Sequence, residues 1–352
     1  GADLSIIEKM RGGFTGVVAE IDSLRPGPTI ALRFDIDAND LNEAQSDEHR
    51  PKALGFSSVN EGACHACGHD GHAAIGLGVA TLLMEKKAEW KGKVRLIFQP
   101  AEEGTRGAKS MVGAGMMNAV DIFLSGHIGF GINDKNMVAC GTTGFLATNK
   151  TDVNFTGYST HAGGNPELGK NALLAAANSA LALHAISRHS KGASRINVGI
   201  LRAGEGRNVI PPNAYLAFET RGATSEINEF MMSQARRVIE GAAYMYGVNA
   251  EMVPMGEAKG ADSDPGLVKE LVNIVSAMPE AITVKESVYL GGSEDVSYMM
   301  NAVTKQGGKS SYLIFGTEIS APHHNMHFDF DEKVLLLAVK VYTESVIALS
   351  TR

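Results

Sequence analysis

The sequence contains only three cysteines, Cys64, Cys67 and Cys140, and this small odd number argues against a disulfide framework. Such cysteine usage is typical of a reducing compartment. The chain also lacks a run of about 18 apolar residues, so no transmembrane helix is expected. Its first residues, Gly1 to Leu4, have no signal-peptide pattern. We therefore expect a cytoplasmic protein with no membrane partner.

Positive charge is in short supply, with 32 Lys and Arg residues against 39 Asp and Glu residues and a net charge of −7. No basic cluster is present, so nucleic acid is not expected as a partner. The 352 residues, 44% of them hydrophobic, are typical of a globular chain with two domains.

The first third of the chain alternates between predicted strands and helices. An apolar helix is expected over residues 72–85, and strands that end in polar residues are expected over 29–37, 94–98 and 121–127. This alternation favours an α/β fold with an open, mostly parallel sheet flanked by helices. Such sheets place their ligands beyond the carboxyl ends of the strands.

The middle of the chain has a different rhythm. Helices are expected over 171–188 and 225–246, the second with Ser225 as N-cap and Gly247 as its stop. Strands are expected over 152–156, 195–201, 214–221 and 248–253. This βαββαβ order is typical of a ferredoxin-like α+β domain. Further helices are expected over about 265–277 and 294–301, and a strand over 311–315. We therefore predict a discontinuous catalytic domain, 1–146 and 255–352, with an inserted lid or dimerisation domain at 147–254.

Two motifs carry the strongest chemical signal. Residues 66–72 read ACGHDGH, and residues 99–104 read QPAEEG. A thiolate, imidazoles and carboxylates are the ligands of divalent-metal hydrolases, and a spare carboxylate beside a ligand can take a proton from water. The candidate metal ligands are Cys67, His69, Glu103, His127 and one histidine of the pair His323 and His324. Two metal ions would need a shared anionic ligand, and a thiolate can bridge.

Adjacent carboxylates point in different directions, so one residue of the pair Glu102 and Glu103 can bind metal while the other acts as general base. Spacing does not decide between them, and we assign Glu102 as the base. Asp35 and Asp37, at a strand end, either orient ligating histidines or form a turn.

Three polar residues of the middle region are candidates for contacts with a substrate. His161 and Asn208 can donate hydrogen bonds to a developing oxyanion, and Arg221 can hold a carboxylate. His184 and His189 are expected to be surface or packing residues. A redox role for Cys64 and Cys67, formally a CxxC pair, is disfavoured because the pair lies inside a histidine cluster.

Taken in order, the motifs resemble the amidohydrolase branch of the M20 metallopeptidases, and within it the aminobenzoyl-glutamate hydrolases. The resemblance runs from about residue 12 to the C-terminus and is carried by LRFDID at 32–37, HACGHDGH at 65–72, FQPAEEG at 98–104, GYSTHAG at 157–163, NVIP at 208–211, GSED at 292–295, and HHN at 323–325 followed by FDFDE at 328–332. The branch differs in having a longer N-terminal segment and a larger apolar residue at the position of Cys64.

The resemblance implies a zinc-exopeptidase-like catalytic domain with two divalent ions, Mn²⁺ or Zn²⁺. It implies Cys67, His69, Glu103, His127 and His324 as ligands and Glu102 as general base. His161 and Asn208 would stabilise the oxyanion, and Arg221 would bind the substrate carboxylate. The inserted domain would form a homodimer, or the chain would join a related B subunit in a hetero-oligomer.

The activity implied is hydrolysis of p-aminobenzoyl-glutamate to p-aminobenzoate and glutamate. An alternative is a generic hydrolase of N-acyl amino acids, of the hippurate or indole-acetyl type. An alternative from another class is a non-catalytic subunit that pairs with an active one, although a complete ligand set beside Glu102 argues against it.

Overall fold

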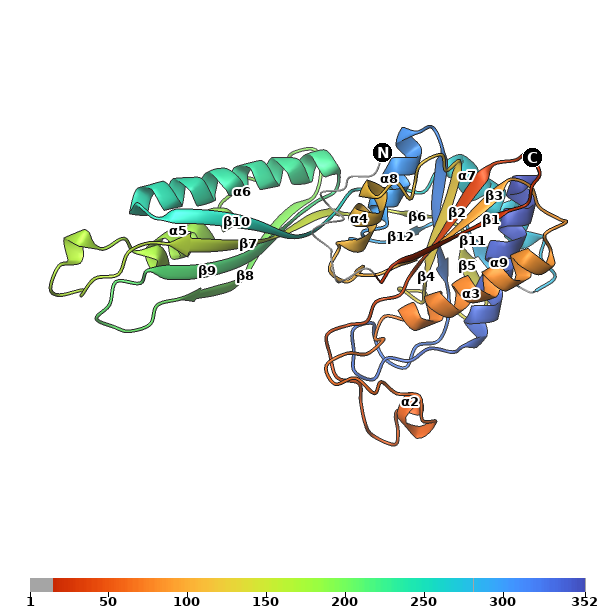
Figure 1. Ribbon diagram of the computed structural model, residues 1–352, viewed down its shortest axis with the longest axis horizontal. Coiled ribbons are helices and arrows are strands. Elements are labelled where there is room, and N and C mark those ends of the chain that lie inside the picture. Colours follow the sequence, from red (N-terminus) through yellow and green to blue (C-terminus); the bar gives the residue numbers. More distant parts are fainter. Residues whose placement is uncertain (1–14, 281, 352) are drawn as a thin grey trace. The chain divides into compact units, whose positions relative to one another are not determined.

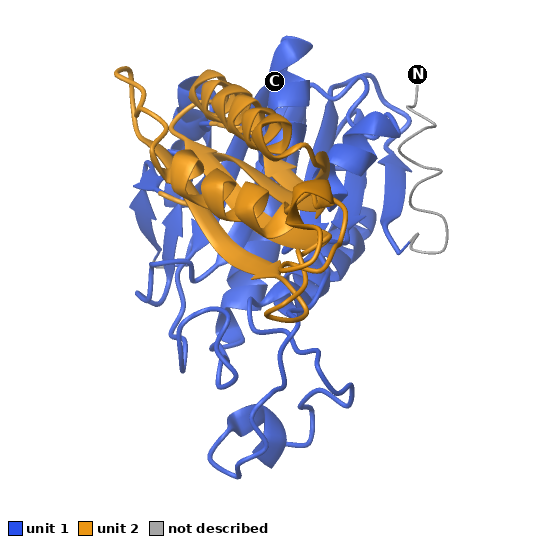
Figure 2. Cartoon of the chain, turned by 90° about the vertical axis from the view of Figure 1, so that its left-hand side faces the viewer, with its two compact units in different colours: residues 1–144, 262–290, 295–352 blue, residues 145–261, 291–294 orange. Residues whose placement is uncertain are grey.

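The computed structural model describes residues 15–280 and 282–351, so residues 1–14 of the predicted catalytic part lie outside the described residues. The chain divides into two compact units, coloured separately in Figure 2. Unit 1 comprises residues 1–144, 262–290 and 295–352, and unit 2 comprises residues 145–261 and 291–294. Unit 2 extends beyond the range 147–254 because its last strand continues to Ala258 and the Leu146 N–H donates to the Gly292 carbonyl at 2.7 Å.

Unit 1 is built on a seven-stranded mixed sheet with the strand order β1-β3-β2-β4-β13-β5-β11. Its strands are β1 (Val17–Asp22), β2 (Thr29–Asp35), β3 (Lys93–Gln99), β4 (Ile122–Ile128), β5 (Met137–Ala139), β11 (Thr283–Lys285) and β13 (Lys309–Phe315), with a separate pair β6 (Thr142–Thr143) and β12 (Val288–Tyr289). Its helices are α2 (Arg50–Ala53), α3 (His69–Glu85), α4 (Gly107–Gly113), α7 (Pro265–Ser276), α8 (Ser297–Lys305) and α9 (Lys333–Ser350).

The centre of this sheet is parallel and deeply buried. Every residue of β2 after Thr29 is buried, as expected for a strand covered on both faces. The helices α3 and α9 pack against one another beside these strands (Figure 1). Val79 of α3, Leu32 of β2 and Tyr342 of α9 belong to one core cluster, and none is more than 2% exposed.

The parallel pairing decides where the polar strand ends meet. β3, β2, β4 and β13 pair in parallel in that order, so their carboxyl ends lie on one edge of the sheet. At this edge Asp35 pairs with Gln99, and Phe315 pairs with Ile128. The segments that follow these strands, including the predicted ligand motifs, therefore begin from the same side of unit 1.

Unit 2 is a four-stranded antiparallel sheet with the strand order β10-β7-β9-β8, covered on one face by two helices (Figure 1). Its elements in chain order are β7 (Ala147–Thr156), α5 (Ala172–His184), β8 (Ser194–Ala203), β9 (Asn213–Gly222), α6 (Ser225–Tyr246) and β10 (Asn249–Ala258). The order and the pairing are those of the ferredoxin-like fold. Residues of α5 and α6 share a core cluster with Phe155, Leu216 and Phe218.

Some predicted element ends were wrong. The N-cap of α6 is Thr224, whose hydroxyl accepts the Ile227 N–H at 3.3 Å, whereas Ser225 is the first helical residue. Gly247 ends this helix in the left-handed conformation, with φ 63°, as predicted. The helix α8 begins at Ser297 rather than at 294, and Asp295 instead accepts hydrogen bonds in the core. Among the described residues, no helix is both long and apolar enough to cross a membrane.

Candidate metal centre

The cysteine–histidine motif lies where the chain turns into α3. Gly68 has φ 85°, a left-handed conformation that glycine adopts without steric cost, and it separates Cys67 from His69, the first residue of the helix. Cys67 is 4% exposed and His69 is 1% exposed. The turn therefore presents two buried candidate ligands of different chemistry from nearby backbone positions.

Two groups of potential ligands share the Cys67 thiol. Cys67, His69 and Glu103 form one group, in which all the ligand atoms lie within 4.8 Å of one another. Cys67, His127 and His323 form a second group by the same measure. A bridged pair of divalent ions needs a shared anionic ligand, and a thiolate common to two sets of ligands can supply it. The residues thus fit two ions better than one.

Hydrogen bonds fix which histidine nitrogens face this cluster. The Nδ1 of His127 donates to the carbonyl of Ile128 at 2.8 Å, which leaves its Nε2 toward the Cys67 sulfur at 3.4 Å. The Nδ1 of His69 lies 3.0 Å from the carbonyl of Asp37, and its buried Nε2 has no hydrogen-bond partner among the described residues. Metal-ligating histidines usually donate their other N–H in this way. Both Nε2 atoms therefore suit a metal ion.

His72 belongs to the motif but serves a different purpose. Its Nδ1 donates to the carboxylate of Asp35, and its Nε2 accepts the N–H of Ile128 at 3.0 Å. Both ring nitrogens are occupied, so His72 braces the end of β4 and has no lone pair left for a metal. The sequence motif predicted His69 and not His72 as a ligand, and it gave no role for His72, which lies one helical turn further on.

The carboxylate pair lies in a tight turn after β3. Ala101 has φ 59°, and the Thr105 N–H donates to the Glu102 carbonyl at 2.6 Å. The Glu103 N–H donates to Asp37 Oδ2 at 3.0 Å, which ties this turn to the end of β2. Asp37 therefore contacts two candidate ligands, the ring of His69 and the backbone of Glu103.

The two histidines of the last motif have different surroundings. His324 has φ 63°, its N–H donates to the Ala66 carbonyl at 2.7 Å, and its Nε2 lies 3.3 Å from Glu103 Oε2. His323 instead contacts the Ile128 carbonyl through Nε2 at 3.1 Å and packs against the ring of Phe328. The geometry thus places His324 beside the Glu103 group and His323 beside the His127 group.

Burial and neighbouring charges set the ionisation of the cluster. Burial raises the pKa of the Cys67 thiol, and the carboxylates of Glu103 and Glu102 raise it further. Burial alone would lower the pKa of His69, but the negative charge of Asp35 and the contacts with Asp37 raise it to about 9. The cluster is therefore rich in negative charge, which divalent ions would compensate.

A buried polar network lies behind the cluster. Arg33 is 1% exposed, and its guanidinium contacts Asp35 at 2.7 Å, Asp295 at 3.2 Å and the Gln99 side chain at 2.8 Å. Asp295 also accepts the Ala108 N–H at 2.9 Å, at the start of α4. Asp35 in turn holds His72, so the network connects the centre of the sheet to the ligand edge. A single charged residue inside the apolar strand 29–34 was the available sequence signal, because a buried arginine requires a partner.

Unit 2 brings His161 and Asn208 together. His161 pairs with Val209, and the Ala162 N–H donates to the Asn208 carbonyl at 2.9 Å. The Nδ1 of His161 accepts the Gly163 N–H at 3.1 Å, so the proton is on Nε2, where it can be donated to an oxyanion. Both residues are exposed.

Arg221 lies at the other end of the same sheet. It pairs with Thr148, close to the point where the chain enters unit 2, and its guanidinium binds Glu219 at 3.0 and 3.2 Å. The residues around His161 and Asn208 instead adjoin the start of β9 at Asn213. Eight residues of extended strand separate Asn213 from Arg221, which corresponds to about 27 Å. Within one copy of unit 2, a small substrate cannot contact both ends.

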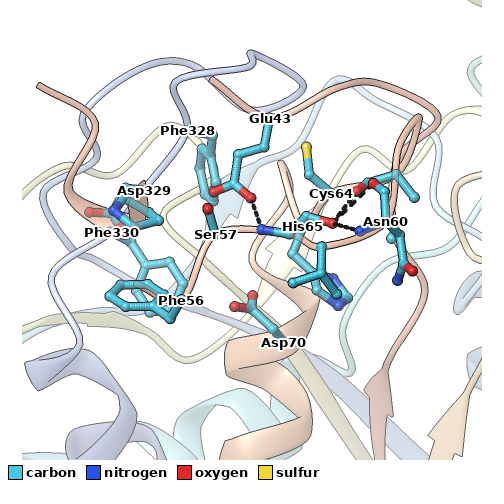
Figure 3. Close-up of a pocket in the computed structure, with 15 residues that line it drawn as sticks. Glu43, Phe56, Ser57, Asn60, Cys64, His65, Asp70, Phe328, Asp329 and Phe330 are labelled. Carbon is cyan, nitrogen blue, oxygen red and sulfur yellow. Dashed lines mark hydrogen bonds between the residues drawn. The ribbon is translucent and has the colours of Figure 1, made fainter. Parts of the chain in front are cut away.

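Cys64 lies apart from the ligand groups. It lines a pocket of ≈320 Å³ together with Phe56, His65, Asp70 and Phe328 (Figure 3). Cys64 and Cys67 are both free thiols. Cys64 lines this pocket and is absent from both groups of potential ligands that share Cys67.

Comparison with known proteins places this geometry among hydrolases. A model described as Peptidase family M20/M25/M40 matches residues 31–348. Indole-3-acetyl-aspartic acid hydrolase of Enterobacter agglomerans is 51% identical over 341 residues, which is 97% of this chain and 78% of that protein. One of the subunits of the p-aminobenzoyl-glutamate hydrolase of Escherichia coli K12 is 49% identical over 350 residues, covering 99% of this chain and 80% of the relative.

Solved structures give the same result. The aminobenzoyl-glutamate utilization protein from Klebsiella pneumoniae superposes with a TM-score of 0.78 at 40% identity, over 99% of this chain and 78% of that one. A Bacillus subtilis protein, described as a dinuclear metal binding peptidase from the M20 family, superposes with a TM-score of 0.70 at 25% identity, over 99% of this chain and 92% of that one.

Proposed function

Because the chain belongs to peptidase family M20/M25/M40 and is a metal-dependent hydrolase, we propose that it cleaves the amide bond of p-aminobenzoyl-glutamate. The observation that carries this proposal is the cluster of Cys67, His69 and Glu103 with Glu102 beside it. In addition, the chain is 49% identical to a hydrolase named for that substrate. A complete ligand set beside a spare carboxylate argues against a non-catalytic subunit.

A second candidate substrate is indole-3-acetyl-aspartate, favoured by the 51% identity to the hydrolase named for it. Both candidates join an aromatic acyl group to an acidic amino acid. The two proposals therefore differ in the acyl group and agree on the chemistry of the leaving group. A generic N-acyl-amino-acid hydrolase would show no such preference.

The ligands we propose are Cys67, His69, Glu103, His127 and His324, and this set fits either Mn²⁺ or Zn²⁺. Bound divalent ions would polarise the scissile carbonyl and increase the acidity of a water molecule. The Glu102 carboxylate takes the proton of that water and passes it to the leaving amide nitrogen. The side chains of His161 and Asn208 donate to the oxyanion, and Arg221 binds a carboxylate of the amino acid.

We further propose that His161 and Asn208 act at the metal centre of a second copy or partner. The separation of about 27 Å between the two ends of β9 supports this arrangement, since one substrate must contact both ends. Among the residues that the structure describes, β8 has no partner on its outer edge, where Ile200 and Leu201 are exposed, and Leu181 of α5 is 77% exposed. Such a surface suits a homodimer or a hetero-oligomer with a related B subunit. Three free cysteines support a cytoplasmic location.

The first experiment is to measure glutamate release from p-aminobenzoyl-glutamate by the Mn²⁺-loaded protein, with Glu102→Ala as the blank. Indole-3-acetyl-aspartate and hippurate are measured in parallel. Release that Glu102→Ala abolishes supports the proposal. Faster turnover of indole-3-acetyl-aspartate favours the second candidate, and equal turnover of hippurate favours the generic one. No turnover by the folded, two-metal protein contradicts all three, and the addition of a B subunit then tests the pairing alternative.

A further inference from the structure

Unit 2 contains a small pocket whose lining side chains carry more positive than negative charge. Its volume is ≈400 Å³, within the range of small-molecule sites. We call it the acid pocket, and it is lined by Arg188, Arg195, Ile196, Asn197, Glu219 and Arg221. Three guanidinium groups therefore line the same small space as a single carboxylate.

The sheet register places two of these arginines side by side. Arg195 of β8 and Arg221 of β9 are directly paired, and Asn197 faces Glu219 in the same way. Directly opposite residues have Cβ atoms about 4.5–5.5 Å apart, and like charges in that position repel. Along β9 the buried Phe218 and Thr220 alternate with Glu219 and Arg221, so the charged residues lie on the face of the sheet that the helices leave open.

The protein supplies only part of the compensating negative charge. Glu219 binds Arg221 through both oxygens, at 3.0 and 3.2 Å, which uses two of the five N–H groups of that guanidinium. Arg188 donates to the Ile186 carbonyl at 3.3 Å. Within residues 15–280 and 282–351, neither Arg188 nor Arg195 has an ion-pair partner. Two positive charges of the pocket are thus left for a ligand.

We propose that the acid pocket recognises both carboxylates of an acidic amino-acid leaving group. Arg221, oriented by Glu219, binds the α-carboxylate, and Arg195, with Arg188 beside it, binds the side-chain carboxylate. This proposal rests on the proposed function and adds its specificity-determining residue, Arg195. Two carboxylates match the net charge of +2 that three arginines and one glutamate leave in the pocket, and guanidinium groups bind carboxylates through paired hydrogen bonds. A substrate with a neutral side chain leaves the repulsion between Arg195 and Arg221 in place.

The test compares two substrates that differ only in the side-chain charge, p-aminobenzoyl-glutamate and p-aminobenzoyl-glutamine. For Arg195→Gln, kcat/KM for the glutamate conjugate falls by about 10- to 100-fold, mainly through KM, as expected for a lost hydrogen bond between charged groups. The glutamine conjugate changes less than about threefold. Arg195→Lys, which keeps the charge and loses the fork, restores part of the loss. Arg202→Gln, on the same strand outside the pocket, is the matched control and keeps the wild-type preference.

Binding measurements test the acid pocket independently of whether the protein hydrolyses the substrate. The Glu102→Ala protein is titrated calorimetrically with both conjugates, with and without Arg195→Gln. A preference for the glutamate conjugate that Arg195→Gln removes supports the acid pocket, even if the wild-type protein hydrolyses neither compound and the proposed function fails. An unchanged preference in Arg195→Gln overturns the acid pocket, even if hydrolysis is observed. Thermal unfolding of each variant shows that the exposed substitution leaves the fold intact.

Discussion

Glu102 and Glu103 are neighbours in the chain, and their surroundings support the different roles proposed for them. Glu103 belongs to the ligand group with Cys67 and His69, and its carboxylate contacts His324 at 3.3 Å. The contact with His324 lowers the pKa of Glu103, although burial alone would raise it. An anionic oxygen held among imidazoles is suited to bind metal, which leaves Glu102 for proton transfer.

Substitution of the two glutamates separates these roles. We expect Glu102→Gln to bind two metal ions and to lose about 10²- to 10⁴-fold in kcat, the usual contribution of a general base. Glu103→Gln should instead lose bound metal. Metal analysis alongside kinetics checks both. The reverse pattern, with metal lost only in Glu102→Gln, would contradict the assignment.

The ionisation of His69 makes metal binding dependent on pH. With a pKa raised to about 9 in the metal-free protein, His69 is protonated at pH 7, whereas a metal ligand must be neutral. Below about pH 9, metal affinity should therefore fall about tenfold for each unit of pH decrease, and more steeply where the Cys67 proton is also displaced.

Calorimetry in buffers of different ionisation enthalpy measures the protons released when Zn²⁺ binds at pH 7. We expect more than one proton for the wild-type protein and fewer for Cys67→Ala. Cys140→Ala removes a buried thiol outside the ligand groups and serves as the control. Zn²⁺ binding at pH 7 without any release of protons would show that His69 is not a ligand.

At the scale of elements, the central strand β2 connects core stability to the metal edge. Arg33 lies in the middle of this apolar strand and is paired with Asp35 and Asp295. Asp295 directly follows residues 291–294, the short segment that belongs to unit 2. The chain returns to unit 1 at Asp295, and the ion pair with Arg33 therefore holds this point against β2.

Removal of Arg33 should be costly because two buried carboxylates, Asp35 and Asp295, would lose the cation that they share. We expect Arg33→Leu to lower the free energy of unfolding by about 3–5 kcal/mol. Lys86→Met, which removes a more exposed pair with Glu344 at 2.9 Å, should cost less than about 1 kcal/mol. Urea unfolding of the metal-free proteins gives both values. Similar losses in the two variants would contradict the role of the buried network.

At the scale of the whole molecule, the two ends of β9 separate residues that the proposed reaction needs together. Arg221 pairs with Thr148, near the start of unit 2, whereas His161 and Asn208 adjoin the opposite end of the sheet. A site shared between two copies of the chain reconciles these positions with a single substrate. Mixing experiments can test such sharing directly.

Glu102→Ala and His161→Ala should each be inactive alone, and their mixture should regain activity after the two variants exchange partners. A mixed dimer has one metal centre with an intact Glu102 and an intact His161 from the partner. Random exchange should therefore restore about a quarter of the wild-type activity, because half the dimers are mixed and each has one working site. Activity of separate and mixed samples is compared after partial unfolding and refolding. A mixture as inactive as its components contradicts a shared site.

The sequence by itself determined the class of fold, the order of its elements and the chemistry of the metal edge. Those features are local, because Glu102 and Glu103 follow the apolar strand β3 by a few residues and His127 lies near the end of β4. Likewise, α6 has its periodicity and its Gly247 stop within 23 residues. The tertiary structure decided which atoms meet. Arg33 and Asp295 are 262 residues apart, the tautomers of His72 and His127 depend on the backbone of Ile128, and Arg195 faces Arg221 only through the register of β8 and β9. Contacts of this kind depend on how distant segments pack, and no local pattern of residue types specifies them.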